Sequence, residues 1–119
     1  MIILSTRDEG GFFYYLALLI GMGLVGAYMW YILVTPSPYE VYNFIMYMTG
    51  ALLVATSFLF AYAKTRTSRV LMTVLSGIIG GMHFFLDIAL YGYVMGLILF
   101  AWLAFGLLLS FAAFNWLLE

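Results

Sequence analysis

The chain has 119 residues, of which 67% are hydrophobic and only 8% are charged, whereas soluble domains carry roughly 25% charged residues. A formal net charge of -1 with four basic residues excludes the electrostatic footprint of a nucleic-acid-binding protein. The lack of cysteine excludes disulfide frameworks, thiolate metal sites and cysteine nucleophiles.

This composition predicts an all-α integral membrane protein in which residues 1–119 form a single transmembrane four-helix domain. A helix needs about 20 apolar residues to cross a bilayer, so four helices with short loops use nearly the whole chain. The predicted spans cover residues 12–34, 41–63, 70–88 and 94–117.

The first and third connections are marked by helix-breaking residues. Pro36 and Pro38 follow the first span, and proline lacks the N–H donor that a continuing helix requires. The last two spans are separated only by Gly92 between two tyrosines. An uninterrupted helix over residues 70–117 would be about 70 Å long, more than twice the thickness of the hydrocarbon core. The chain must therefore reverse near Gly92.

The basic residues predict the orientation in the membrane. Lys64, Arg66 and Arg69 lie in the second loop, and short loops rich in Lys and Arg stay on the cytoplasmic side. Both termini are then inside, in agreement with Arg7, and we expect a multi-pass protein of the prokaryotic plasma membrane. The aromatic residues expected at the outer boundary are Tyr28, Trp30, Tyr31, Tyr39, Tyr42, Tyr91 and Tyr93.

Polar residues share one face of the third predicted span, within an arc of about 80° at 100° per residue. A second seam, at seven-residue spacing, follows the second span. Polar groups in the hydrocarbon face protein or water rather than lipid, so we predict that the two seams meet. The predicted helix-contact residues are Thr73, Ser76, Gly80, His83 and Asp87 on the third span and Asn43 and Ser57 on the second.

His83 is the only histidine, and Asp87 follows it one helical turn later. The pair could act as a proton relay or as a ligand with its orienting carboxylate. We favour a polar clasp between packed helices, because such contacts are common in membrane proteins. Asp87 could also be a hydrated residue at the helix end, since it lies about 27 Å along the helix from Arg69.

The chain contains few side chains for catalysis or metal binding. Zinc and copper sites need three or four ligands, so we expect no metal site unless a partner chain adds ligands to His83. Ser76 lies two turns from His83, beyond the reach of a nucleophile and its base. We therefore expect no catalytic residue and no cofactor in this chain alone.

Small residues recur at spacings that allow helices to approach closely. Residues 21–26 match the Gly-x-Gly-x-x-Gly spacing of dinucleotide-binding turns, but they lie inside a hydrophobic span and not between a strand and a helix. Close helix packing explains them better. The same small-xxx-small spacing occurs in the pairs Gly77 and Gly81, Gly92 and Gly96, Ala51 and Ala55, and Gly106 and Ser110.

The Gly-Gly-Met-His sequence at residues 80–83, followed by Asp87, resembles a Gly-x-Arg-His-x-x-x-Asp stretch in the cytochrome b membrane anchors of succinate dehydrogenases. The resemblance covers a short part of one span. Met82 replaces the family's arginine, Ser76 replaces its axial haem histidine, and the inferred direction of the span is opposite. The resemblance implies a haem-poor or haem-free anchor near a quinone.

The sequence as a whole predicts a small non-catalytic accessory subunit that packs against other integral membrane subunits and lipids. The expected host is a multi-subunit oxidoreductase, such as a respiratory oxidase, a quinone-linked dehydrogenase or a copper-dependent membrane monooxygenase. One alternative is a homo-oligomeric transporter or channel that uses Asp87 and His83. A second alternative is a haem- or quinone-associated membrane anchor, in which His83 needs a second ligand from another chain.

Overall fold

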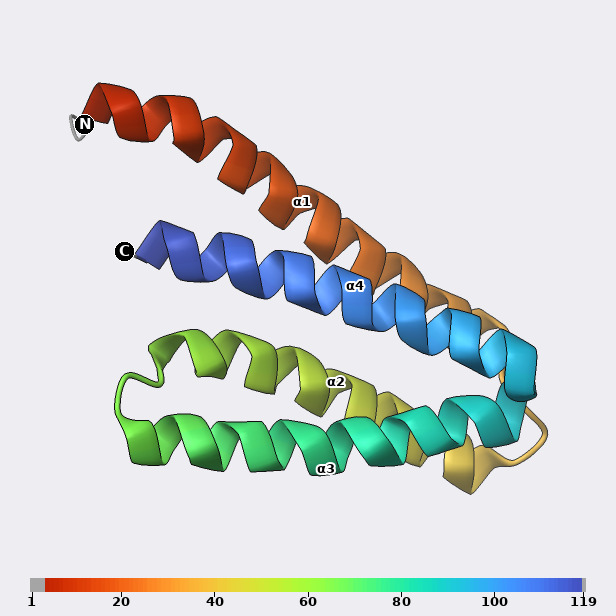
Figure 1. Ribbon diagram of the computed structural model, residues 1–119. Coiled ribbons are helices and arrows are strands. Elements are labelled where there is room, and N and C mark those ends of the chain that lie inside the picture. The colour runs from red at the N-terminus through yellow and green to blue at the C-terminus, as the bar shows by residue number, and fades with distance from the viewer. Residues whose placement is uncertain (1–3, 119) are drawn as a thin grey trace.

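The computed structural model describes the backbone of residues 4–118 and the side chains of residues 11–118. This part of the chain is helical except for short connections (Figure 1). The helices are α1 (Leu4–Val34), α2 (Glu40–Tyr62), α3 (Arg66–Tyr91) and α4 (Tyr93–Leu118). Each is long and apolar enough to cross a membrane. The prediction of four helices of membrane-spanning length and hydropathy is confirmed. Helix α1 begins before the predicted residue 12, and α3 extends beyond the predicted residues 70–88 at both ends.

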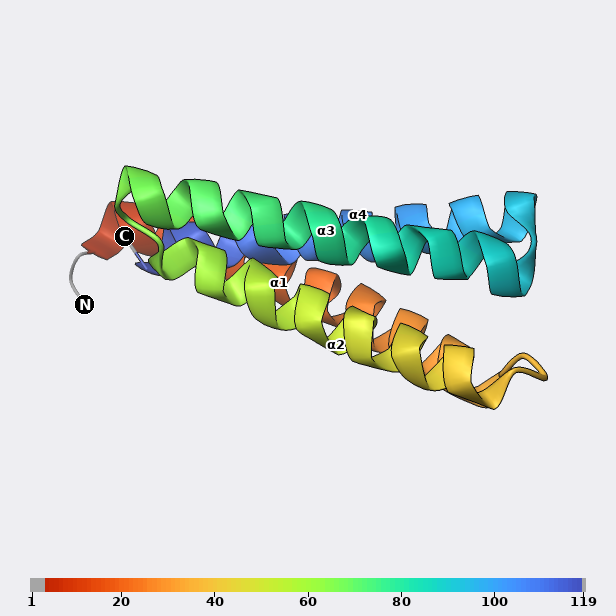
Figure 2. The same ribbon diagram turned by 90° about the horizontal axis from the view of Figure 1, so that it is seen from below.

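Helix α4 is the centre of the bundle, because it packs extensively against α1 and also against both α2 and α3, whereas α1 and α2 meet only briefly. Helices α2 and α3 form a hairpin, and α4 separates this hairpin from α1 at the end that carries both termini (Figure 1; Figure 2 gives the view from below). We call this the basic-loop end, since Lys64, Arg66 and Arg69 lie there. The opposite end, with Pro36 and Pro38, is the proline-loop end. The backbones of α1 and α3 do not approach each other within the described residues.

Proline determines how α1 ends. The carbonyl of Ile32 would accept a helical bond from the N–H of residue 36, but Pro36 has none. Two tyrosine hydroxyls replace that donor: Tyr47 donates to the Ile32 carbonyl at 3.2 Å and Tyr91 at 3.4 Å. Tyr91 also donates to the carbonyl of Thr35 at 2.9 Å. The proline break is thereby used to join α1 to α2 and α3.

A capping box starts α3 four residues before the predicted span. The Thr65 hydroxyl accepts from the backbone N–H of Ser68 at 3.1 Å, and the Ser68 hydroxyl accepts from the backbone N–H of Thr65 at 3.2 Å. This reciprocal pair satisfies donors that a helix start otherwise leaves free. Because of this cap, α3 begins with the polar residues 66–69, at the basic-loop end.

Gly92 alone connects α3 to α4, as the sequence predicts for the reversal. Its φ of 96° lies in a region that residues with a side chain rarely adopt. Gly96 then brings α4 against α3: a Cβ added there would lie 2.6 Å from the Ile88 Cα and 2.7 Å from the Asp87 carbonyl oxygen. Only glycine fits this contact between backbones.

The other small residues divide into buried and bare positions. Gly21 of α1 packs against α4, where an added Cβ would lie 2.8 Å from the Ser110 nitrogen and 3.0 Å from the Gly106 oxygen. By contrast, an added Cβ would meet no atom within 4 Å at Gly23, Gly26, Gly77 or Gly81. The small residues of the α1–α4 contact are therefore needed for these two helices to pack closely. No neighbouring atom of the described structure requires a glycine at the other four positions.

Candidate functional site

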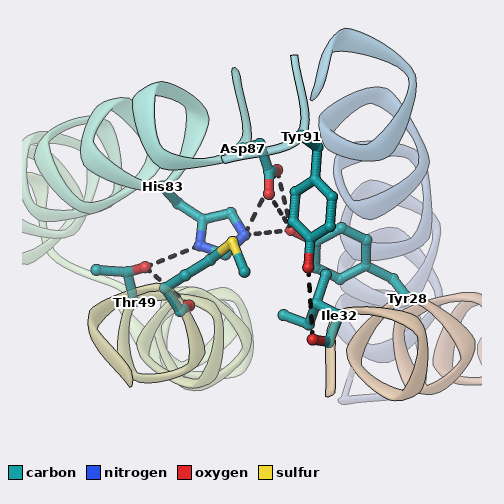
Figure 3. Close-up of polar contacts among 7 residues, drawn as sticks. Tyr28, Ile32, Thr49, His83, Asp87 and Tyr91 are labelled. Carbon is teal, nitrogen blue, oxygen red and sulfur yellow. Dashed lines mark hydrogen bonds and ion pairs between the residues drawn. The ribbon is translucent and has the colours of Figure 1, made fainter. Parts of the chain in front are cut away.

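Side chains from three helices meet in one hydrogen-bonded network near the proline-loop end (Figure 3). The Tyr28 hydroxyl of α1 lies 2.8 Å and 2.9 Å from the two carboxylate oxygens of Asp87 and 2.5 Å from Nε2 of His83, both on α3. On the other side of the imidazole, Thr49 Oγ1 of α2 lies 2.8 Å from Nδ1. We call Tyr28, Thr49, His83 and Asp87 the polar clasp.

The polar clasp is closed to solvent. Tyr28, His83 and Asp87 are 0% exposed, so a water-sized probe touches none of them. Nε2 of His83 is 3.6 Å from Oδ2 of Asp87, and the tyrosine hydroxyl bridges the two groups. Asp87 is therefore not a hydrated helix-end residue: its partner is a tyrosine of a non-adjacent helix.

Two arrangements of hydrogen atoms satisfy every contact in the polar clasp. With Asp87 ionised and His83 doubly protonated, Nε2–H donates to the Tyr28 oxygen and the Tyr28 O–H donates to the carboxylate. With Asp87 protonated, its O–H donates to Tyr28, and Tyr28 donates to Nε2 of a neutral His83. In both, Nδ1–H donates to Thr49, whose O–H donates to the Met46 carbonyl at 3.0 Å.

These two arrangements hold the same number of protons and carry no net charge. They interconvert when two protons shift along Asp87, Tyr28 and His83, without exchange with water. Removing a proton would leave a net charge and an unmade hydrogen bond in a sealed apolar interior, which is costly. The geometry can thus shuttle protons internally, but the complete burial of the three side chains leaves no exit for them.

Small residues and aromatic rings position the polar clasp. Gly50 of α2 lets the imidazole approach, because an added Cβ would lie 3.2 Å from Cε1 of His83. Gly96 holds α4 against the backbone of Asp87. The Trp102 ring of α4 packs edge-on against Tyr28, with 6.3 Å between ring centroids. The close approach of α2 and α4 to α3 at these two glycines therefore allows Tyr28 of α1 to reach α3, although the backbones of α1 and α3 do not meet.

The other predicted site residues lie outside the polar clasp. Ser57 and Ser76 line the same groove near the basic-loop end, and Gly80 lies further along it. Thr73 is exposed and donates to the carbonyl of Arg69 on its own helix at 2.8 Å. The structure brings Ser57 and Ser76 together across α2 and α3, but the two hydroxyls share no hydrogen bond in the described structure.

Asn43 has a different environment from the other predicted residues. Its amide oxygen accepts from the Ser37 hydroxyl at 2.8 Å, and its amide nitrogen donates to the Ser37 carbonyl at 2.7 Å. Asn43 is buried, but it holds the proline loop and bonds no residue of α3. Its match to the seven-residue spacing did not reveal this local role.

Sequence reasoning missed Tyr28 and Thr49 as members of the polar clasp. Tyr28 was predicted to lie in the outer aromatic belt, but it is fully buried and faces α3. Thr49 lies on α2 outside the seven-residue spacing of Asn43 and Ser57, so that spacing does not select it. Each residue is ordinary in its local sequence, and only the tertiary arrangement gives it a partner.

The polar clasp does not fit haem or metal ligation by His83. Both imidazole nitrogens already have partners within hydrogen-bonding distance, and the ring is sealed. Within residues 11–118, no group of three or more His, Cys, Asp or Glu side chains could hold a metal ion. Neither a protein-family model, nor a curated protein, nor a solved structure matches this chain.

Proposed function

We propose that this protein is a small accessory subunit of a larger membrane complex and has no active centre of its own. The observation that carries this proposal is a contrast in how polar and small residues are used. Its one buried imidazole and its one buried carboxylate, within the described residues, are occupied by each other and by Tyr28 and Thr49. Glycines of two helices, by contrast, are left bare on the outside.

The bare glycines supply a surface for another helix. Gly77 and Gly81 lie one turn apart on α3, are exposed, and have no atom within 4 Å of a built Cβ. Gly23 and Gly26 give α1 a similar strip. In a bilayer, small residues favour helix association because they let backbones approach closely. These strips would accept helices of neighbouring subunits without any change in the fold.

We infer the orientation of the protein in the membrane from the positions of its basic residues. We place the basic-loop end and both termini in the cytoplasm of a prokaryotic cell, because Lys64, Arg66 and Arg69 gather in the α2–α3 loop. The proposed partners are other integral membrane subunits. For the host we propose a multi-subunit oxidoreductase: a respiratory oxidase, a quinone-linked dehydrogenase or a copper-dependent membrane monooxygenase. The identity of co-purified subunits distinguishes these hosts.

The test is purification of the tagged protein from its native membrane in mild detergent. We expect other integral membrane proteins at a fixed stoichiometry. The double variant Gly77→Leu/Gly81→Leu should lose them while keeping its helical circular dichroism and its melting temperature. Ile78→Leu, a neighbouring exposed position without a gain in size, is the matched control and should keep them.

A homodimer without other subunits would contradict the proposal and favour a transporter or channel. That alternative needs the polar clasp to open, since His83 and Asp87 are sealed in this conformation. It predicts that Asp87→Asn abolishes ion flux in proteoliposomes. Under our proposal proteoliposomes of the isolated protein show no flux that depends on Asp87.

A further inference from the structure

Three cationic side chains surround one opening at the basic-loop end. The opening has a volume of about 440 Å³, and its lining residues are Lys64, Arg66, Arg69, Val70, Thr73 and Val74. Nε of Arg69 donates to the carbonyl of Ala63 at 2.9 Å, which holds the guanidinium at the α2–α3 loop. Its terminal N–H groups remain available for a ligand.

The electrostatics of this end favour an anion. The carboxylates that the structure describes belong to Glu40 and Asp87, which lie toward the proline-loop end, and no described acidic side chain forms an ion pair with the three cations. The N-terminus of α3 lies at the same opening and adds the positive end of the helix dipole. Among the side chains of residues 11–118, positive charge is therefore concentrated at the start of α3.

The opening continues into a groove between α2, α3 and α4. Thr73 lines both the cationic opening and an adjoining cavity of about 370 Å³, and Ser57 and Ser76 line both that cavity and a further one of about 260 Å³ that reaches Gly80. From Arg69 to Gly80 the helical rise is about 16 Å. This is about half of a hydrocarbon core about 30 Å thick, so the groove has the depth of one lipid leaflet.

The groove wall suits a hydrocarbon chain. Leucine and phenylalanine side chains form most of it: Leu53, Phe60, Phe100, Leu103, Leu107, Leu108 and Phe111. The hydroxyls of Ser57 and Thr73 donate to carbonyls of their own helices at 2.9 Å and 2.8 Å, so they do not require a polar ligand. A cationic mouth above an apolar groove matches the two parts of a membrane lipid.

We propose that this groove binds one anionic phospholipid. Its phosphate lies among Lys64, Arg66 and Arg69, and one of its acyl chains lies between α2, α3 and α4. Basic pockets between membrane helices select anionic headgroups by charge complementarity, and each basic residue near the surface is worth about a five-fold change in affinity. The site needs only the groove and the three cations, so it is independent of the proposed role as a subunit.

The experiment counts lipids retained on the full-length protein. The protein is reconstituted in vesicles that contain phosphatidylglycerol and phosphatidylcholine, released into detergent and examined by native mass spectrometry. We expect one phosphatidylglycerol to remain bound and phosphatidylcholine to be depleted relative to the vesicle. The triple variant Lys64→Gln/Arg66→Gln/Arg69→Gln should retain lipid at the vesicle ratio.

Three further variants test the groove separately from the cations and control for damage to the fold. Ser76→Phe fills the groove without changing charge and should release the bound lipid, whereas Ile78→Phe on an exposed face of the same helix should not. The charge-conserving variant Lys64→Arg/Arg66→Lys/Arg69→Lys should keep the preference for phosphatidylglycerol, which controls for damage to the fold of the triple variant.

Three results would overturn the inference. The first is equal retention of phosphatidylcholine and phosphatidylglycerol by the unmodified protein. The second is an unchanged preference in the triple variant. The third is displacement of the bound lipid by a neutral quinone added to the vesicles, which would assign the groove to a different ligand.

Discussion

The polar face of α3 meets two different environments along its length. Toward the proline-loop end, His83 and Asp87 are fully buried and hydrogen-bonded to α1 and α2. Toward the basic-loop end, Thr73 and Ser76 line an open groove and have no partner on another helix in the described structure. One periodic pattern in the sequence thus produces a closed contact at one end and an open surface at the other.

The position of α1 accounts for this difference. Near the proline-loop end, the side chains of Tyr28 and Tyr91 bridge α1 and α3, whose backbones do not touch. At the basic-loop end, α4 lies between α1 and the α2/α3 hairpin (Figure 1). Among residues 11–118, the cavities beside Ser76 are lined by residues of α2, α3 and α4 and by none of α1. The periodic spacing of polar residues identifies a face of α3 that is sheltered from lipid. Which helix contacts that face determines whether it forms a closed contact or an open groove.

The largest expected effect comes from the glycine that brings α4 against the closed end. Gly96→Ala puts a Cβ into contact with the backbone of Ile88 and Asp87, and such overpacking should lower the free energy of unfolding by about 3 kcal/mol. Gly81→Ala, where an added Cβ meets no atom within 4 Å, should leave it unchanged or slightly higher. Unfolding by steric trapping in bicelles measures both. Equal losses in the two variants would refute the assigned helix contact.

The second effect comes from the hydroxyl at the centre of the polar clasp. Tyr28→Phe removes the hydroxyl to which Asp87 and Nε2 of His83 are both hydrogen-bonded. The direct distance of 3.6 Å between Nε2 and Oδ2 of Asp87 is too long for a hydrogen bond, so both groups are left unsatisfied in a sealed interior. Burying an unsatisfied polar group costs about 1–3 kcal/mol, and we expect a loss of about 2 kcal/mol. Tyr31→Phe, one turn further along α1, removes a hydroxyl for which the described structure shows no hydrogen bond. It should cost less than about 0.5 kcal/mol.

A smaller effect distinguishes two buried threonines of α2. Thr49→Val removes the partner of Nδ1 of His83 and should cost about 1 kcal/mol, the usual scale of a hydrogen bond between membrane helices. Thr56 is equally buried, but its hydroxyl donates only to the carbonyl of Leu53 on its own helix. Thr56→Val should therefore change the free energy of unfolding by less than Thr49→Val. The reverse order would count against the inter-helix bond.

The smallest effect is expected in the groove. Ser76 is half-buried, lines the open groove and makes no hydrogen bond in the described structure. Ser76→Ala should alter the free energy of unfolding by less than about 0.5 kcal/mol, as for a surface position. A loss as large as that of Thr49→Val would show that the groove is closed in the folded protein.

The sequence predicted the helices because its signals are local. Hydrophobic length, Pro36 and Pro38 after α1, and Gly92 between α3 and α4 each act on the backbone where they occur. The start of α3 at Arg66 was missed, because a window of hydropathy ignores the capping box of Thr65 and Ser68. Helix ends follow from hydrogen-bond chemistry, which apolar content does not report.

The candidate site was predictable only on its own helix. The face shared by His83 and Asp87 follows from spacing along α3, and both residues are buried. Their partner Tyr28 was not predictable, since a tyrosine near the end of a span fits an aromatic belt equally well. Its role depends on where α4 and α1 cross. Asn43 shows the opposite case. Its spacing on α2 predicts a contact with α3, but its side chain hydrogen-bonds to the nearby Ser37.

A double-mutant cycle between Tyr28→Phe and Asp87→Asn tests the central claim, that the polar clasp is a sealed structural contact between α1 and α3. The free energy of unfolding is measured in bicelles for the two single variants, the double variant and the unmodified protein. We predict a coupling energy of about 1–2 kcal/mol, within the range found for residues that share a hydrogen-bond network. Additive effects within about 0.5 kcal/mol would show that the two side chains do not hold the helices together and would contradict the account.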